Sequence, residues 1–350
     1  MHTCAPIKVA VLGVGFMGQQ HARIYNSLPQ CELVAVADTD SVRANAVAHA
    51  YNCAAYESVA SLLVAHPKLD AVSITVPTTK HEEIATQTIQ EKIPSLVEKP
   101  LASSLEEAQR IVRLAKANNT IVQVGHIERF NPAIEAVSNL SIEPLFIKID
   151  RVSPMPFRSL DIDVVLDIMI HDLDLALMFT NTKSVPTEVE ALGVHIDDAP
   201  IHLAQARITL PNGCLVDVTA SRIALHSKRK IRIFTSDAYI NIDCKEPRAT
   251  MLMLDDYLES LETAQSLLAS GISLTEEDLS GLVRVKNLLP QATFNRDHQL
   301  RKELTDFLSN VKHRKEPLVN VEIGLNALAL AEVVKSRMKC VSKASFTTPP

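Results

Sequence analysis

Six residues near the start of the sequence, Gly13-Val14-Gly15-Phe16-Met17-Gly18, have the G-x-G-x-x-G spacing of a dinucleotide-binding turn. In such a turn Gly13 permits the bend, Gly15 lets a pyrophosphate approach the backbone, and Gly18 allows close helix packing. Asp38 follows about 20 residues later, where a carboxylate accepts hydrogen bonds from the adenosine ribose. None of the three residues after Asp38 is an arginine or lysine that would bind a 2′-phosphate, so the motif predicts NAD rather than NADP. A structural turn beside a capping aspartate is the alternative.

Lys99 is the second candidate for chemistry, in Glu98-Lys99-Pro100 directly after the apolar run Ser95–Val97. If that run is a strand of a parallel sheet, Lys99 lies at the carboxyl edge, where open α/β sheets bind ligands. Its ammonium can hydrogen-bond a reacting hydroxyl and stabilise the developing alkoxide. A surface lysine at a turn is the alternative, and the spacing alone favours neither.

Asp167 and His171 are four residues apart at the start of a predicted amphipathic helix, so both side chains emerge on one face. A histidine is a suitable general base for an alcohol, and a carboxylate one turn away can fix its tautomer. A helix-surface ion pair, helped by Asp172 and Asp174, is the alternative and is the more frequent outcome for this spacing alone.

Four further polar residues are candidates for contact with a substrate. Arg129 can bind an oxygen or phosphate with two hydrogen bonds, or can instead pair with Glu128 or join two domains. His126 either lines a nicotinamide pocket or is a structural histidine. Asn131, before a proline, also marks a helix start. Arg222 begins a basic cluster that can touch a diphosphate, although a solvated strand edge is the better interpretation for most of that cluster.

Alternating apolar runs and helical segments must position these residues in the N-terminal third. The predicted strands are Ile7–Leu12, Leu33–Ala37, Ala71–Val76, Ser95–Val97 and Ile121–Val124. The predicted helices between them are Gly18–Leu28, Ser41–Tyr51, His81–Glu91 and Leu105–Asn118. Strands that are apolar on both faces and separated by helices indicate a doubly wound parallel sheet, the Rossmann arrangement.

The rest of the chain has a different pattern, typical of an α+β domain with a mainly antiparallel sheet and helices on one face. Ile208–Val216 predicts a hairpin in which Asn212-Gly213 supplies a type I′ turn. We expect further strands at Lys230–Phe234 and Tyr239–Ile242, helical character over Met251–Gln291, and a last helix over Ile323–Met338 before a loose polar tail. The predicted domains are 1–125 for the cofactor, 126–322 for substrate and oligomerisation, and 323–350 for the last helix and tail.

The bulk composition narrows the class of protein. The chain has 350 residues, of which 47% are hydrophobic and 22% charged, as expected for a globular protein of two domains. A net charge of -6 argues against nucleic acid and anionic membranes as partners and favours a small molecule. The six cysteines have no zinc-ligand spacing, so we expect reduced thiols and no metal site. Without a signal peptide or a membrane span, a cytoplasmic location is expected.

Five ordered segments together resemble the Gfo/Idh/MocA oxidoreductases: GVGFMGQQH at 13–21, TVPTTKH at 75–81, EKP at 98–100, GHIERFNP at 125–132 and DIMIHDLD at 167–174. The resemblance implies Lys99 and His171 as the catalytic pair, with Asp167 supporting His171. It also implies a homodimer or homotetramer built through the second domain's sheet. One departure is Lys92-Ile93-Pro94, where a glycine usually follows the helix. The implied cofactor contacts are Gly13, Gly15, Phe16, Met17, Gly18, Asp38, Thr75, Pro77, Thr78, His81, Glu98 and Lys99.

Within the family, GHIERFNP and VVLDIMIHDLDL are most similar to members that oxidise the 3-hydroxyl of UDP-N-acetylglucosamine. The resulting ketone is one that an aminotransferase can aminate for lipid A. The resemblance therefore implies NAD-dependent oxidation of a sugar's secondary hydroxyl. The alternatives are a dehydrogenase of cyclitols or free monosaccharides and a non-catalytic regulator that senses NAD or a sugar.

Overall fold

The computed structural model describes residues 5–155, 162–183, 186–196, 200–270, 272–289 and 297–341. Contacts divide the chain into two units: unit 1 comprises residues 1–130 and 295–329, and unit 2 comprises residues 131–294 and 330–350. These ranges differ from the predicted domains, because residues 295–329 pack with the N-terminal part and not with the second domain. The final strand also belongs to unit 2, so residues 323–350 do not form a separate piece.

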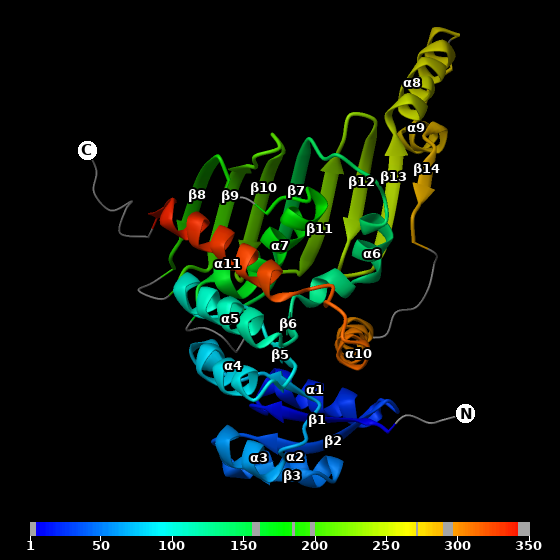
Figure 1. Ribbon diagram of the computed structural model, residues 1–350. Coiled ribbons are helices and arrows are strands. Elements are labelled where there is room, and N and C mark those ends of the chain that lie inside the picture. The colour runs from blue at the N-terminus through cyan, green and yellow to red at the C-terminus, as the bar shows by residue number, and fades with distance from the viewer. Residues whose placement is uncertain are drawn as a thin grey trace, which may run out of the picture. The chain divides into compact units, whose positions relative to one another are not determined.

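Unit 1 contains the expected parallel sheet, which has six strands in the order β3-β2-β1-β4-β5-β6 over its described residues (Figure 1). The prediction of five strands missed β3, a three-residue edge strand of half-buried residues, because so short a run has no measurable alternation. The strands are β1 (Ile7–Leu12), β2 (Cys31–Ala37), β3 (Ala54–Tyr56), β4 (Ala71–Ile74), β5 (Ser95–Val97) and β6 (Val122–Val124).

Several helices of unit 1 begin where side chains satisfy free N–H groups. The Asp40 side chain accepts from the Arg43 N–H at the start of α2, and the Ser104 hydroxyl accepts from the Glu107 N–H at the start of α5. Glu107 in turn accepts from the Ser103 N–H. The helices connecting the strands are α1 (Phe16–Ser27), α2 (Ser41–Tyr51), α3 (Val59–Ala65), the 3₁₀ turn η1 (Thr78–Lys80), α4 (His81–Gln90) and α5 (Leu105–Asn118).

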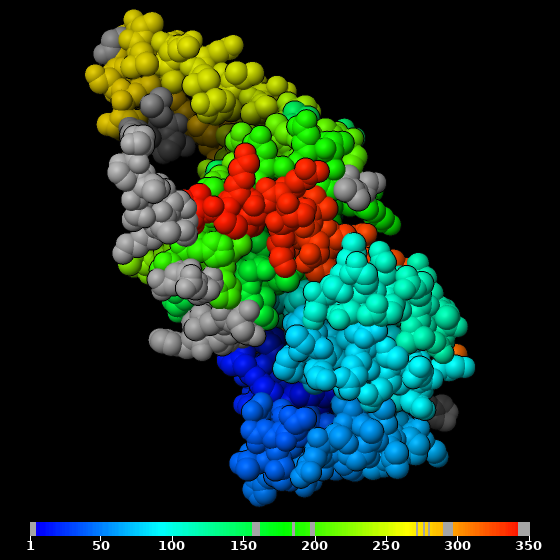
Figure 2. Space-filling view, turned by 90° about the vertical axis from the view of Figure 1, so that its left-hand side faces the viewer, coloured from blue at the N-terminus to red at the C-terminus, as the bar shows by residue number. Residues whose placement is uncertain are grey.

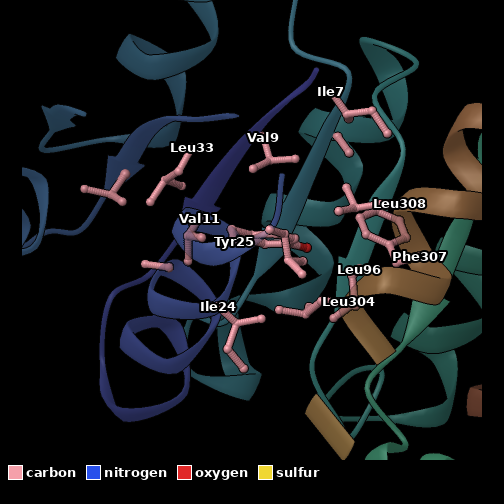
Figure 3. Packing of buried hydrophobic residues seen from close by; sticks show 14 of the residues in the cluster. Ile7, Val9, Val11, Ile24, Tyr25, Leu33, Leu96, Leu304, Phe307 and Leu308 are labelled. Atoms are coloured by element: carbon pink, nitrogen blue, oxygen red, sulfur yellow. The ribbon is translucent and has the colours of Figure 1, made fainter. Parts of the chain in front are cut away.

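Helix α10 (His298–His313) is far along the chain yet packs on the unit 1 sheet. Its amphipathic pattern buries Leu304, Phe307 and Leu308 in the cluster that contains Tyr25 and Leu96, as Figure 3 shows. Each fully buried leucine or phenylalanine stabilises the fold by about 1.5–3 kcal/mol. Burial of this face explains why residues 295–329 belong to unit 1.

Unit 2 is built on a sheet of nine strands over its described residues, in the order β14-β13-β12-β11-β7-β10-β9-β8-β15. Neighbours are antiparallel except for the parallel pairs β7–β10 and β8–β15, so the expected mainly antiparallel sheet is confirmed. The strands are β7 (Phe146–Val152), β8 (Glu188–Val194), β9 (Leu203–Thr209), β10 (Leu215–Ser221), β11 (Lys228–Phe234), β12 (Ala238–Asp243), β13 (Arg248–Met253), β14 (Val285–Asn287) and β15 (Met338–Val341).

One face of this sheet is covered by helices, as predicted. Burial alternates along β7, where Ile147, Ile149 and Arg151 are buried and the other strand residues are half-buried. Helices α6 (Pro132–Ser138) and α7 (Ile170–Phe179), with the last turns of α11 (Val321–Ser336), lie on the buried face (Figure 1). The opposite face carries no helix from the described part of unit 2.

Three local predictions in unit 2 were wrong. The hairpin joining β9 to β10 is present, but its turn is not type I′: Gly213 alone of the described turn residues has a positive φ, of 85°. Pro211 holds a negative φ at the first central position, and the Gly213 N–H donates to the Leu210 carbonyl at 2.9 Å, as in a type I turn. The expected loose tail begins with strand β15, and the helical stretch 251–291 ends in strand β14.

Helices α8 (Leu254–Ala269) and α9 (Glu276–Leu282), with β14, extend beyond β13 at one edge of the unit 2 sheet (Figure 1). Their yellow atoms project from the rest of unit 2 in Figure 2. This confirms the helical character expected for much of Met251–Gln291. None of the described helices has the length and apolar character needed to cross a bilayer.

Candidate cofactor and catalytic site

The glycine turn lies between β1 and α1, as the motif predicts. Gly13 has a φ of 86°, and a Cβ there would lie 2.8 Å from the Val76 backbone. A Cβ on Gly18 would collide with the Gly13 carbonyl oxygen and lie 2.7 Å from Oγ1 of Thr75. The Thr75 hydroxyl itself donates to the Gly13 carbonyl. Close packing therefore requires glycine at 13 and 18, and Thr75 braces the turn from β4.

Gly15 is different, because a Cβ there would meet nothing closer than the Arg43 guanidinium at 4.0 Å. Gly15 is the N-cap of α1, no side chain caps this helix, and its first turn has no acidic residue. The space before Gly15 and the N–H groups of the first turn fit the diphosphate of a dinucleotide. Phe16 is 61% exposed beside this space, and Met17 is half-buried.

Asp38 follows β2 and is fixed against the glycine turn. Its Oδ2 accepts from the Val14 N–H at 2.8 Å and its Oδ1 accepts from the Asp40 N–H at 2.9 Å. The sequence interpretation missed Arg43, whose Nη1 lies 3.5 Å from Oδ2 of Asp38 and whose Nη2 lies 2.8 Å from Oδ2 of Asp40. The signal was available, since the first turn of a helix starting at Ser41 carries Arg43 back towards the strand end.

Glu98 and Lys99 follow β5 at the same sheet edge, because the strands are parallel. Nε2 of His21, on α1, lies 3.1 Å from Oε1 of Glu98, and the Lys99 N–H donates to Oε2 of Glu98 at 3.3 Å. A Cβ on Gly125 would come within 3.0 Å of Oε2, so glycine there leaves room for this carboxylate. Burial alone would raise the pKa of Glu98, but the His21 hydrogen bond and the charges of His21 and Lys99 outweigh it and lower that pKa. Glu98 is therefore a negative group beside Lys99.

His81 is buried and joins two segments of the site. Its Nε2 lies 3.0 Å from the Val76 carbonyl and its Nδ1 lies 2.8 Å from the Pro100 carbonyl. Burial lowers the pKa of His81 despite these two carbonyls. Since both ring nitrogens are engaged by backbone, His81 connects the loop after β4 to the loop after β5. Pro77 is exposed and Thr78 half-buried at the start of η1.

Asp167 and His171 lie where a π-helical turn, Val165–Met169, passes into α7. Both side chains are half-buried. Nη1 of Arg222 lies 3.6 Å from Oδ2 of Asp167, and its Nη2 donates to the Ile162 carbonyl at 2.7 Å. Arg222 has no exposed surface, which argues against its predicted contact with a diphosphate and favours a role in holding Asp167.

The acids considered as helix-surface partners of His171 are not on the surface. Asp172 has no exposed surface, and its carboxylate pairs with the buried Arg151 of β7, with Nη2 to Oδ1 at 2.7 Å. Asp174 is 1% exposed. The turn therefore carries buried ion pairs, a feature that the local sequence did not indicate.

The remaining predicted substrate residues are buried. His126, directly after β6, is 1% exposed, and Arg129 lies with Glu128 in the buried 3₁₀ turn η2 (Ile127–Phe130). Asn131 caps α6 by accepting from the Ala133 N–H at 3.0 Å, and its Nδ2 donates to the Cys244 carbonyl at 2.9 Å. The predicted helix start at Asn131 is confirmed.

The sheet edge of unit 1 thus gathers the glycine turn, Asp38, Thr75 and the Glu98-Lys99 pair. The turn before α7 in unit 2 gathers Asp167, His171 and Arg222. Lys99 and His171 belong to different units, and their convergence stays a prediction.

The sequence is similar to one known protein family and to several known dehydrogenases. Residues 7–126 match the Gfo/Idh/MocA profile, described as an oxidoreductase family with an NAD-binding Rossmann fold. The chain is 37% identical over 238 residues to UDP-N-acetylglucosamine 3-dehydrogenase of Acidithiobacillus ferrooxidans, covering 68% of this chain and 74% of that protein. It is 28% identical over 232 residues to scyllo-inositol 2-dehydrogenase (NAD(+)) of Bacillus subtilis, covering 62% of this chain and 67% of that protein.

A solved structure of the Acidithiobacillus ferrooxidans enzyme agrees with the architecture. It superposes with a TM-score of 0.81 and 29% identity, over 96% of this chain and 98% of that one. The profile match, the identity to this enzyme and the glycine turn point to one assignment. The chain belongs to the Gfo/Idh/MocA family of oxidoreductases and contains its NAD-binding Rossmann fold.

Proposed function

We propose that this chain is an NAD-dependent dehydrogenase that oxidises the 3-hydroxyl of UDP-N-acetylglucosamine to a ketone. The observation that carries the proposal is the position of Lys99 on the same sheet edge as the glycine turn, beside the hydrogen-bonded Glu98–His21 pair. The identity to UDP-N-acetylglucosamine 3-dehydrogenase supports this substrate. Such a ketone can be aminated, and we propose that the enzyme supplies a precursor of lipid A in this way.

NAD is the proposed cofactor, and when bound it supplies the hydride acceptor. The N–H groups at the start of α1 and the space before Gly15 would hold the diphosphate. Asp38 would accept hydrogen bonds from the ribose hydroxyls. Its negative charge, and the engagement of Arg43 by two carboxylates, oppose a 2′-phosphate. Phe16, Met17, Pro77 and Thr78 remain proposed contacts.

Lys99 and His171 share the proposed chemistry at the hydroxyl. The Lys99 ammonium donates a hydrogen bond to the reacting oxygen and stabilises the negative charge that develops there. The His171 imidazole accepts the hydroxyl proton as general base. Asp167 stabilises the resulting imidazolium, and the ion pair with Arg222 holds the Asp167 carboxylate in position. In this scheme Arg222 is a positioning residue, while Arg129, Asn131 and His126 remain candidates for sugar contacts.

A substrate screen tests the proposal. NADH absorbance is followed with UDP-N-acetylglucosamine, inositol and glucose at equal concentrations. We expect UDP-N-acetylglucosamine to have the highest kcat/KM. A preference for inositol would favour the cyclitol alternative, which the similarity to scyllo-inositol 2-dehydrogenase supports. Failure to reduce NAD with any sugar would revive the regulator alternative.

We also propose that the helix-free face of the unit 2 sheet forms a homodimer or homotetramer contact. Five apolar residues lie side by side on this face, one on each of five adjacent strands, and each is paired directly with the next. We call them the apolar row: Leu215, Phe146, Phe234, Tyr239 and Leu252. Phe234 is 39% exposed, and its ring centroid lies 4.7 Å from that of Tyr239. The next row contains Asp217, Lys148 and Arg232. An exposed apolar row with charges beside it is typical of a protein interface.

The cytoplasm is the proposed location. The described cysteines form no disulfide with one another, as expected in a reducing compartment.

A further inference from the structure

Glu303 is a buried acid that the proposed chemistry does not use. It lies on α10 and has no exposed surface, and neither carboxyl oxygen has a hydrogen-bond partner among the described residues. Its backbone carbonyl accepts from Nε2 of Gln123, on β6, at 3.3 Å. Gln123 is also fully buried, and its Oε1 has no partner in the described part of the chain. Two polar side chains therefore share the interior behind the carboxyl edge of the sheet.

The groups around Glu303 come from every element packed on this part of α10. Glu98, after β5, and Asp306, on α10, are close enough for their negative charges to act on Glu303. Tyr25 on α1 is close enough for an electrostatic interaction with the Glu303 carboxyl group, and its hydroxyl is hydrogen-bonded to the Ser73 hydroxyl at 2.8 Å. The turn η2, which packs against α10, carries buried Glu128 and Arg129.

His21 links this interior to the site. Its Nε2 faces Glu98, while its buried Nδ1 has no partner among the described residues. Its ring centroid lies 6.4 Å from that of Tyr25, with the rings edge to face. Four buried polar atoms thus lack partners on three elements: two on Glu303, one on Gln123 and one on His21.

An ionised carboxylate without hydrogen bonds would be very costly in such a place. Burial raises the pKa of Glu303 well above its ordinary value, and the charges of Glu98 and Asp306 raise it further. Glu98 has the opposite shift. Of the two acids, Glu303 is therefore protonated and Glu98 is ionised, because two negative charges close together would repel one another.

We propose that Glu303 is a positioning residue for Lys99: it stays protonated behind Glu98, so that Glu98 alone of the two is negative and keeps its hydrogen bond with His21. The proposal rests on the proposed function in naming Lys99 as the catalytic group. The protonated acid supplies an O–H donor to an interior that contains Oε1 of Gln123, a buried acceptor without a partner among the described residues. Ionised Glu303 would repel Glu98 and displace the backbone that carries Lys99.

The protonation of Glu303 is tested by stability, independently of activity. Unfolded Glu303 loses its proton near pH 4.5, whereas the folded group keeps it to higher pH. Between these two pKa values, rising pH favours unfolding by about tenfold per pH unit. Glu303→Gln replaces the carboxyl group with an amide that does not titrate, so this pH dependence is absent from the variant. We expect the ratio of wild-type to E303Q unfolding constants in urea to rise about tenfold per pH unit from pH 5 upward. A ratio that is constant over pH would overturn the protonated state.

The positioning role is tested by kcat and KM in the full-length chain. Glu303→Leu removes the polar group, and we expect kcat to fall at least about tenfold while the sugar KM changes less than about threefold. E303Q should recover kcat to within about threefold, because its neutral amide keeps a donor. Thr305→Leu is the matched control, since Thr305 lies on the same helix but its side chain is exposed. We expect its kcat within about twofold of wild type.

The outcomes distinguish the two proposals. Wild-type kcat in folded E303L would overturn the positioning role while the dehydrogenase function stands. Absence of activity in the wild-type chain would overturn the function, and the stability comparison would still decide the protonation state of Glu303.

Discussion

At the scale of single residues, the proposed choice of NAD rests on how Asp38 and Arg43 are paired. Asp38 is bonded to two backbone N–H groups and carries a charge that would face a ribose. Arg43 lies beside Asp38 and Asp40, so its positive charge is already neutralised. In the proposed site Asp38 would attract the ribose hydroxyls, while Asp38 and Asp40 together occupy the cation that a 2′-phosphate would need.

Replacing Asp38 by Asn should therefore relax the selectivity for NAD. The amide oxygen can still accept hydrogen bonds, but the charge that opposes the phosphate is lost. We expect the ratio of kcat/KM for NAD to that for NADP to fall about 10- to 100-fold. The comparison is Asp40→Asn, which keeps the ribose acceptor and weakens only the hold on Arg43, so the ratio should fall less than in D38N. An unchanged ratio in D38N would show that Asp38 does not select the cofactor.

Motif spacing predicted the residues whose neighbours are close in sequence. Gly13, Gly18 and Asp38 are positioned as the dinucleotide-binding turn requires, because a strand, a turn and a helix are consecutive along the chain. His21 and Glu303 were not found. Their importance depends on Glu98 and α10, which lie 77 and more residues away, and no local pattern indicates such contacts.

At the scale of elements, the end of α4 departs from the usual family pattern. Lys92 follows this helix with a φ of 55°, in the left-handed region where glycine is usual. The turn is closed by the Ile93 N–H, which donates to the Thr88 carbonyl at 2.9 Å. The helix end is therefore formed normally, with a side chain that disfavours its backbone conformation.

Lys92→Gly should stabilise the chain by about 0.5–1 kcal/mol, because glycine adopts this conformation without a Cβ clash. The measurement is the free energy of unfolding in urea, followed by far-UV circular dichroism. Lys92→Ala is the matched control: it removes the charge but keeps the Cβ, and we expect no gain. Equal stabilisation by both variants would assign the effect to the side chain and contradict the backbone explanation.

Most elements were predicted because their burial patterns extend over several residues. The predicted bounds of β1, α2 and α5 agree with the structure, since each has a clear apolar pattern or a capped start. The strands β3, β14 and β15 were missed because three or four residues at a sheet edge show no alternation. Longer elements were also not predicted individually, namely the strands β7, β8 and β13 and the helices α3 and α10. The turn at Pro211 was misassigned because the Asn-Gly rule was applied without the constraint of the preceding proline.

At the scale of the whole molecule, no helix among the described residues of unit 2 covers one broad face of its sheet. The apolar row crosses five strands on this face, and its members are directly paired. Ion pairs beside the row, such as Lys228 with Asp150 at 3.0 Å, neutralise one another within the chain. The face is therefore suited to contact a second copy without a net charge penalty.

Phe234→Asp should lower the mass of the oligomer, because a charge would be buried in the contact. We expect a shift towards monomer at micromolar concentration in sedimentation analysis, with NAD binding retained. Leu268→Asp is the control, since Leu268 is exposed on α8 and lies outside the sheet. An unchanged mass in F234D, or a monomeric wild-type chain, would contradict the proposed contact.

The central claim is that Lys99 of unit 1 and His171 of unit 2 act on the same hydroxyl. A double-mutant cycle with Lys99→Met and His171→Ala measures this directly, using the sugar that the substrate screen identifies. Each single variant should lower kcat by about 10²–10⁴-fold, and the double variant should be at most about tenfold slower than the slower single. NAD affinity should stay within about threefold of wild type in all variants. Effects that multiply in the double variant, or wild-type turnover in either single variant, would contradict a shared site.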